Sequence, residues 1–470
     1  MDSYISKYQF KSIGDNLLKY IIPSEYHIRI DIDNLVLRIY RDKNLLEYDE
    51  ILSKYSVNES PAAISFIKHL ILADYSLKAF KARRRINTQF VWRLIFDSLT
   101  FFKKANPNAG IGSQGFLSIE LFRYESGKNR KILRLHIWDE SFASEFKGNE
   151  YGKYKVHSHL YNAQSHVLVG SISNHRYVVS QTKDTSAESL YKIEWKSEKD
   201  DKGLTKRTSE LNIDLENVRL KKASSETVTI GQEYSVSINE YHSSNSNSPL
   251  TATLFLFNSD EGLNDLSKVV GPKNDSEPGF KYEQINIIPS LYDIDREVKK
   301  YYNKQKLLAL DWMRKIHTLE HAHRIESRHL NTFSEILSWS IVGLPAIIAG
   351  LTFYFKQLPD MPDEKESIIV GVAILAGIST LLGTINKVIK PSNLSEKHRL
   401  NSEKFEHLRH KLEKYIIFNN DDRLELVLEE IQKDWKELTL HNVKEYNFKR
   451  ASKMIKSMKV YPENLAFLKE

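Results

Sequence analysis

The sequence predicts a multidomain α+β protein in which a mixed α/β part and a β-rich barrel or sandwich precede an all-α region with two membrane-spanning helices. Three observations predict this class. Short runs of alternating apolar and polar residues fill much of 110–290, no Gly or Pro occurs in 293–335, and two long apolar segments follow. We therefore divide the 470 residues into parts at 1–109, 110–290 and 291–470.

The composition limits the classes of function that the chain can have. Charged residues make up 27% of it, so most of the chain is expected in water. It has no cysteine, which excludes disulfides, thiolate metal sites and thiol catalysis and fits a reducing compartment. The net charge of +7 favours an anionic partner. The first 20 residues lack the pattern of a signal peptide, so we expect the first part of the chain to stay in the cytosol.

The part at 1–109 combines one strand-like stretch with helices. Residues 27–42 alternate as a strand does, whereas 60–104 shows helical spacing. Within 78–104, eight basic residues stand against one acidic residue, and aromatic residues lie among them. Cations that neutralise phosphates and rings that stack on bases suit single-stranded nucleic acid. The candidates for such contacts are Arg83, Arg84, Arg85, Trp92 and Arg93. An ordinary basic helix with a buried aromatic face is the other interpretation.

The part at 110–290 contains several short alternating runs with turn residues between them, which is typical of a barrel or a sandwich. Residues 192–228 are polar and charged, and we expect an exposed hairpin or loop insert there. Basic and aromatic residues near the predicted mouth of this barrel suit an anionic ligand. They are Arg134, Tyr151, Lys153, Tyr154, Lys155 and Arg176.

One segment of this part, YGKYKVHSHLYNAQSHVLVGSISNHRYVV, resembles the first motif of the cupins through His157-x-His159. His242 stands where the last metal ligand of a cupin would be. The expected acidic ligand is missing, and Gln164 stands near its place. We therefore assign no metal and no other cofactor, with His157, His159 and His242 as weak candidates. Since no Walker loop, GxSxG elbow or HExxH motif is present, we expect no enzyme. A membrane-anchored cupin metalloenzyme remains an alternative.

The apolar segments at 336–355 and 367–387 each have about 20 residues, which as helices match the hydrocarbon thickness of a bilayer. Aromatic residues flank the first segment, and the loop between the two is short and acidic. Basic residues lie on both outer sides, so the positive-inside rule places both flanks in the cytoplasm. The sequence thus predicts a membrane hairpin with both termini cytoplasmic.

The second segment has a face of small and hydroxyl-bearing residues. At helical spacing this face consists of Ala376, Gly377, Thr380, Gly383, Thr384 and Lys387. One interpretation is close packing of helices, and the other is the wall of a water-filled pore. Because one hairpin cannot enclose a pore, the second interpretation requires several copies around an axis. In the first segment, Gly343, Ala346 and Gly350 form a similar face, where we expect the second helix to pack.

The apolar segments lie between predicted cytoplasmic helices. One long helix covers 293–335 and enters the membrane, and two amphipathic helices are expected at about 394–418 and 423–457, with a turn at 419–422. This order, with EKHRLNSEKFEHLRHKLEKY after the spans, resembles the SLATT domain family over about residues 295–450. The resemblance implies a pore-forming effector of bacterial antiphage defence in the inner membrane.

Within that family, a soluble crown before the pore helices is similar to the membrane effectors of Hailong defence systems. This resemblance implies a homotetramer held closed by single-stranded oligodeoxyadenylate, which a partner nucleotidyltransferase makes. Loss of the DNA would open the channel and arrest growth. A related effector opened by a cyclic nucleotide is an alternative, and so is a membrane scaffold without conductance.

Overall fold

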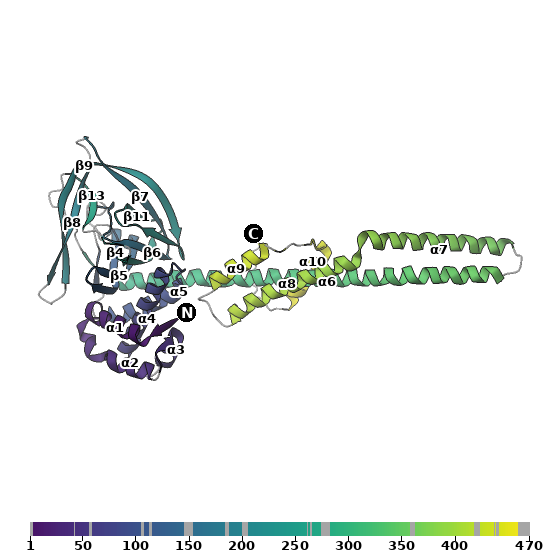
Figure 1. Cartoon of the computed structure of the whole chain (residues 1–470), viewed down its shortest axis with the longest axis horizontal. Coiled ribbons are helices and arrows are strands. Elements are labelled where there is room, and N and C mark those ends of the chain that lie inside the picture. Colours follow the sequence, from purple (N-terminus) through teal and green to yellow (C-terminus); the bar gives the residue numbers. More distant parts are fainter. Residues whose placement is uncertain are drawn as a thin grey trace. The chain divides into compact units, whose positions relative to one another are not determined.

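The computed structural model divides into two compact units, Met1–Tyr301 and Tyr302–Glu470, called here the N-terminal unit and the helical unit. The described residues are 3–41, 43–55, 59–104, 108–111, 115–144, 154–183, 188–199, 205–260, 262–263, 266–273, 283–357, 362–417, 424–436, 438 and 441–458. Figure 1 shows mixed helices and strands in the first unit and helices in the second. The predicted α+β class is confirmed.

The N-terminal unit begins with a helical layer and a two-stranded ribbon. The ribbon pairs β1 (Tyr4–Ser6) with β2 (Leu45–Glu47). The helices are α1 (Lys7–Tyr20), η1 (Ser24–Arg29), α2 (Ile32–Tyr40), α3 (Tyr48–Tyr55), α4 (Pro61–Lys81) and α5 (Thr88–Phe102). The helices predicted within 60–104 are thus confirmed as α4 and α5. Ser60 and Asn87 cap α4 and α5, because their side chains accept hydrogen bonds from the backbone N–H groups of Ala63 and Phe90.

The strand predicted at 27–42 is wrong, because this stretch forms η1 and α2 instead. The Asp31 side chain accepts a hydrogen bond from the Asn34 N–H at 3.0 Å and so begins α2. Leu35, Val36 and Ile39 then recur at helical spacing and are buried. The alternation near the start of the stretch resembles a strand, but the apolar spacing after Asp31 is helical.

Two antiparallel sheets follow, one of which is a half-barrel. The strand orders are β10-β6-β12-β5-β4-β3-β14 and β11-β7-β9-β8-β13. Their bounds are β3 (Asn108–Ile111), β4 (Leu117–Ser126), β5 (Asn129–Asp139), β6 (Asn162–Val169), β7 (Ser171–Gln181), β8 (Glu188–Lys199), β9 (Thr205–Thr229), β10 (Glu233–Val236), β11 (Tyr241–Ser246), β12 (Leu250–Asn258), β13 (Ser267–Gly271) and β14 (Glu283–Asn286). A short 3₁₀ helix, η2 (Glu140–Ser144), follows β5. Trp138 and Phe255 from the first sheet pack with Ile172 and Val228 from the second.

The hairpin expected at 192–228 is present as the pair β8 and β9, whose partners run from Glu188 with Val218 to Lys199 with Thr205. It is no insert, however, because β9 also pairs with β7 and is the middle strand of its sheet. The two edge strands of this sheet, β11 and β13, are joined at His157. The His157 N–H donates to His242 O at 3.0 Å, and the Ser158 N–H donates to Lys268 O at 2.8 Å.

The helical unit contains most of α6 (Ile288–Gln357), then α7 (Pro362–Ile389), α8 (Pro391–Ile417), α9 (Leu424–Lys436) and α10 (Glu445–Ser457). The long helix predicted at 293–335 and the helix predicted at 394–418 are confirmed. The single helix predicted at 423–457 is wrong, because α9 ends at Lys436 and α10 begins at Glu445. No Gly or Pro marks this break, but Thr439, Asn442 and Val443 have low helix propensity. The turn expected at 419–422 lies outside the described residues.

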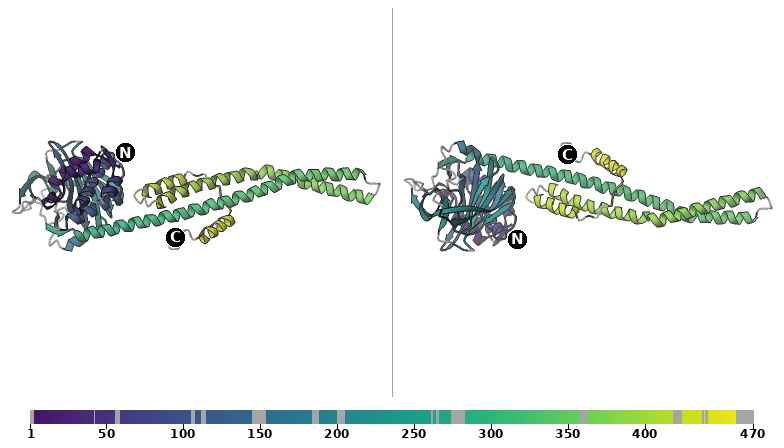
Figure 2. Two further views of the ribbon diagram at one scale, coloured as in Figure 1. Left: turned by 90° about the horizontal axis from the view of Figure 1, so that it is seen from below. Right: turned by 90° about the horizontal axis from the view of Figure 1, so that it is seen from above.

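The core of the helical unit lies where α6, α8 and α9 meet. Its buried residues are Ala309, Met313, Ile316, Phe405, Leu408, Leu412, Val427, Leu428 and Ile431. Beyond this core, α7 runs beside the end of α6 (Figure 1 and Figure 2). Between α7 and α8, Lys390 has a positive φ of 47°, and Pro391 begins the next helix. The return arm of the hairpin is therefore broken at one residue, whereas α6 is continuous.

Candidate functional site

The hairpin of α6 and α7 contains two apolar stretches that are long enough to cross a membrane. Of the most apolar 18-residue window, 6% is buried in α6 and none in the helix after it. The core helix of a soluble protein would bury such a stretch, whereas a helix that faces lipid does not. The exposure of both stretches is compatible with membrane insertion.

The two arms of the hairpin each have one row of shielded side chains. Shielded residues recur at alternating spacings of three and four, the pattern of helices that pack side by side. They include Leu337, Ile341, Leu344, Ile348 and Leu351 on α6, and Val372, Leu375, Ser379, Leu382 and Asn386 on α7. Since α6 and α7 run side by side in both figures, we infer that these shielded faces are turned towards each other.

The predicted contact through Gly343, Ala346 and Gly350 is therefore wrong. Ala346 and Gly350 are exposed, and a Cβ atom added at Gly343 or Gly350 would meet none of the described residues within 4 Å. The alternating Leu and Ile residues of α6 form a wider apolar face than the three small residues, and this face turns towards α7. The small face is left without cover within the described part of the chain.

The small face of α7 is uncovered in the same way. Ala376, Gly377, Thr380, Thr384 and Lys387 are exposed, and Gly383 is partly exposed. A Cβ atom added at Gly371, Gly377 or Gly383 would meet nothing within 4 Å among the described residues. The Thr380 hydroxyl donates to Ala376 O, and the Thr384 hydroxyl donates to Thr380 O, each at 2.9 Å. Both hydroxyl protons are thus used within the helix, and neither is needed for a bond to another helix.

A second candidate site lies in the N-terminal unit, where His157, His159 and His242 come together. Their possible ligand atoms all lie within 4.8 Å of one another, and His159 Nε2 is 2.8 Å from His242 Nε2. His157 and His159 come from the segment that joins β11 to β13, and His242 lies on β11. The Phe255 and Phe257 rings pack against the His159 ring in T-shaped geometry. Sequence spacing predicted this grouping as a weak metal candidate.

The surroundings of these histidines keep the imidazoles neutral. Burial lowers the pKa of His157 to about 4. Burial also lowers the pKa values of His159 and His242 well below the usual range, and the neighbouring histidines lower them further. No pattern in the sequence points to two of the residues around them. His136, buried on β5, adds to these shifts, and Asn174, buried on β7, bonds His242. Both come close only because strands far apart in sequence pair.

Two aromatic residues predicted to contact a nucleic-acid ligand are buried instead. The Trp92 ring is 2% exposed, and its indole N–H donates to Asp295 Oδ1 at 3.3 Å. Tyr154 is also 2% exposed and packs edge-on against Tyr191. Neither ring is open to a base, so these two site predictions are wrong. Each residue is buried in surroundings that a run of basic neighbours in the sequence does not reveal.

The predicted basic contacts differ in their exposure to solvent. Arg134 forms an ion pair with Glu120 at 3.4 Å, and Arg176 forms ion pairs with Glu226 at 2.6 Å and with Glu240. These carboxylates already neutralise the two guanidinium groups. Arg83, Arg84, Arg93 and Lys155 are exposed, and Arg85 is partly exposed. Tyr151 and Lys153 lie outside the described residues.

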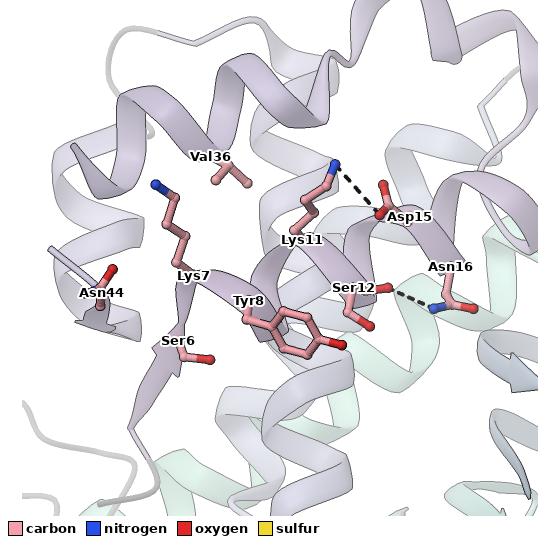
Figure 3. A pocket seen from close by; sticks show the side chains of 9 residues that line it. All are labelled: Ser6, Lys7, Tyr8, Lys11, Ser12, Asp15, Asn16, Val36 and Asn44. Atoms are coloured by element: carbon pink, nitrogen blue, oxygen red, sulfur yellow. Dashed lines mark hydrogen bonds and ion pairs between the residues drawn. The ribbon is translucent and has the colours of Figure 1, made fainter. Parts of the chain in front are cut away.

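A hollow lies beside α1 and Val36 of α2 (Figure 3). Its lining consists of Ser6, Lys7, Tyr8, Lys11, Ser12, Asp15, Asn16, Val36 and Asn44. Lys11 lies 3.8 Å from Asp15 and 2.5 Å from Asp33, so its charge is balanced by acidic neighbours. None of the residues that the sequence predicted for a site lines this hollow.

A scan against protein-family models, a search of curated proteins and a search of solved structures each found no match to this chain.

Proposed function

We propose that this chain is a subunit of an oligomeric membrane channel of the SLATT type. The observation that carries the proposal is the small face of α7, whose residues are exposed except for the partly exposed Gly383, and whose glycines have no described atom within 4 Å of an added Cβ. Several copies around one axis would bring these faces together as the wall of a pore. The proposed pore-lining residues are Ala376, Gly377, Thr380, Gly383, Thr384 and Lys387.

The distribution of residues around α7 supports this arrangement. Shielded residues such as Val372 and Leu375 face α6, whereas Val370, Ile374 and Leu381 are bulky, apolar and exposed. The small face is a third side, and it ends in Lys387. A helix surrounded only by lipid and by α6 would gain from bulky apolar residues on both exposed sides. Instead, the bulky apolar side of α7 suits lipid, and the small, hydroxyl-bearing side suits a water-filled axis.

The proposal assigns the N-terminal unit to the control of the pore by an anionic nucleotide ligand, with the half-barrel as a cupin-like binding module. The net charge of +7 and the exposed Arg83, Arg84 and Arg93 support an anionic ligand. By resemblance, the ligand is single-stranded oligodeoxyadenylate from a partner nucleotidyltransferase, and it holds a tetramer closed in the bacterial inner membrane with both termini cytoplasmic. Release would then arrest growth in antiphage defence; opening by a cyclic nucleotide is the alternative.

The energy needed for such control is modest. Moving a gate from 1:99 to 99:1 takes about 5.5 kcal/mol of differential binding. Over four subunits this is roughly 1.4 kcal/mol each. A charge-assisted hydrogen bond contributes about 1.5–3 kcal/mol, so one or two phosphate contacts in each subunit are enough.

Ion flux from liposomes that contain the purified full-length chain tests the pore. Thr380→Leu and Thr384→Leu place bulk and an apolar surface on the proposed wall, so we expect both to lower flux strongly. Ile374→Leu on the bulky face is the matched control and should leave flux unchanged. Flux that is absent from the wild type, or that is equal in all variants, would refute the pore.

Nucleic-acid binding tests the ligand separately. We expect the wild type, purified in detergent, to bind single-stranded oligodeoxyadenylate at low salt. Removing the charges of Arg84 and Arg93 should weaken binding and lower the salt dependence, by about 0.7 in the log–log slope for each phosphate that is no longer neutralised. Lys221→Ala, at an exposed position on β9, is the control. If protein purified free of nucleic acid does not bind oligonucleotides, the proposal of a DNA ligand is contradicted. The proposal of a pore is tested separately, by the flux assay.

A further inference from the structure

We propose that His157, His159 and His242 form a binding site for a divalent transition-metal ion such as Zn²⁺, which fastens the segment around His157 to β11. The site is separate from the proposed pore and does not depend on it.

The spacing of the three rings is close to that of a metal centre. Zinc binds imidazole nitrogens at about 2.0–2.1 Å in tetrahedral geometry, which places two ligand nitrogens about 3.3 Å apart. His159 Nε2 and His242 Nε2 are 2.8 Å apart, and the possible ligand atoms of all three residues lie within 4.8 Å of one another. Changes in separation of about 0.5 Å at the short pair, and of at most about 1.5 Å at the longest, would bring the nitrogens to the spacing of a tetrahedral site.

Hydrogen bonds fix which nitrogen of two of these rings is free. His157 Nδ1 lies 2.9 Å from the carbonyl oxygen of Lys155, and His242 Nδ1 lies 2.9 Å from Asn174 Oδ1. Both partners of Nδ1 are oxygen acceptors, so each Nδ1 carries its proton and donates it. The lone pair of each ring is therefore on Nε2, and His242 Nε2 faces His159 Nε2 at 2.8 Å. Metal-binding histidines usually donate their other N–H to a carbonyl in this way, which orients the ring and raises its basicity.

The chemistry of the donors selects the class of ion. The possible ligands in this group are three imidazoles, which suit Zn²⁺, Co²⁺ or Ni²⁺, whereas Ca²⁺ and Mg²⁺ require oxygen ligands. Metals bind the neutral form of histidine, and burial keeps these rings neutral near pH 7. Three protein ligands leave one tetrahedral position for water or a small anion.

The position of the cluster gives the ion a structural effect. The backbone of His157 pairs with His242 on β11 and lies beside Val269 on β13, so this segment joins both edges of the five-stranded sheet. A metal bound to His157, His159 and His242 would link the same segment to β11 through side chains. Because only the folded chain brings these residues together, binding stabilises the folded state.

Metal binding to the full-length chain in detergent, stripped with a chelator and then titrated with Zn²⁺ and with Co²⁺, tests the inference. We expect one ion per chain, a Co²⁺ spectrum of tetrahedral type, and a Tm that rises by several degrees at about 100 times Kd. His159→Gln and His242→Gln should abolish stoichiometric binding. His175→Gln, a partly exposed histidine on β7 bonded to Ser225, should bind as the wild type does.

Wild-type protein that takes up neither ion overturns the inference. Unchanged binding in both cluster variants, or an equal loss in His175→Gln, overturns it as well. If circular dichroism shows that the cluster variants do not fold, the Co²⁺ affinity of Asn174→Ala tests the site instead. This variant keeps all three imidazoles but removes the partner of His242 Nδ1, so Co²⁺ affinity should fall about 10- to 100-fold. Unchanged Co²⁺ affinity in this variant counts against the site.

Discussion

Replacing Asn447 by alanine takes away the main partner of a buried carboxylate in the helical unit. Asn447 lies on α10 and is 2% exposed, and its side-chain amide donates a hydrogen bond to Glu326 on α6. Glu326 is 3% exposed. A cationic neighbour of this carboxylate, Lys444, is 3.7 Å away and largely exposed. Apart from Asn447, only Ala451 and Ile455 are buried among the described residues of α10, so a few side chains hold this helix in place.

The size of the effect follows from these contacts. A hydrogen bond to a charged group contributes about 1.5–3 kcal/mol, and burying an isoleucine contributes a similar amount. An isolated helix of 13 residues is marginal in water, so α10 depends on its docking. A loss of about 2 kcal/mol lowers the ratio of docked to undocked α10 about 30-fold. Asn447→Ala should therefore release α10 while the core around Phe405 stays folded.

Hydrogen exchange of the full-length chain in detergent measures this release. Amides of α10 should exchange about 30-fold faster in Asn447→Ala, whereas amides of α8 keep their rates. Arg450→Ala, at an exposed position on the same helix, is the matched control. Unchanged rates in α10, or equal acceleration by Arg450→Ala, would refute the assignment of the docking energy to the pair of Asn447 and Glu326.

Three further predictions concern stability. Burial, with help from His398 and His441, lowers the pKa of His323 to about 4. In the unfolded chain this histidine binds its proton near pH 6.5, so the free energy of unfolding should fall as pH falls from about 6.5 to about 4. Denaturation followed by circular dichroism measures this dependence, and His323→Gln should flatten it. Gly170 has a φ of 79°, and an added Cβ atom would lie 2.4 Å from Leu250 O. Gly170→Ala should thus cost more than about 2 kcal/mol in urea denaturation, against about 1 kcal/mol for Gly127→Ala, where φ is 58° and no described atom lies within 4 Å. Trp92→Ala should cost about 3–5 kcal/mol in the same assay and leave nucleic-acid affinity of the folded protein unchanged, since the ring is buried.

Elements with one strong local signal could be predicted from the sequence. The long helix at 293–335 was evident because no Gly or Pro interrupts it, and the apolar segments were evident from their length. The stretch at 27–42 was misread because its alternation lasts only a few residues before the Asp31 cap begins a helix. The break after Lys436 was missed because no strong helix breaker marks it.

The site residues show what local patterns leave out. His157, His159 and His242 could be grouped because two of them alternate on one segment and the third follows a strand-like run. His136 and Asn174 could not be grouped with them, since strand pairing alone brings them near. Trp92 was misassigned because basic residues surround it in the sequence, whereas in the fold its ring is buried beside Phe96 and bonds Asp295. Burial and pairing depend on residues that are distant in sequence.

The break at Lys390 gives the two arms of the hairpin different mechanics. Pro391 has no N–H to donate, so the helical hydrogen-bond ladder is interrupted where α7 meets α8. Lys390 also leaves the helical conformation, with a φ of 47°. The arm formed by α6 has no such interruption before Gln357, although Pro345 removes one of its hydrogen bonds. A rotation applied to α6 is therefore transmitted along its axis into the apolar region. A movement of α8 instead changes the backbone angles at Lys390, so α7 keeps its orientation.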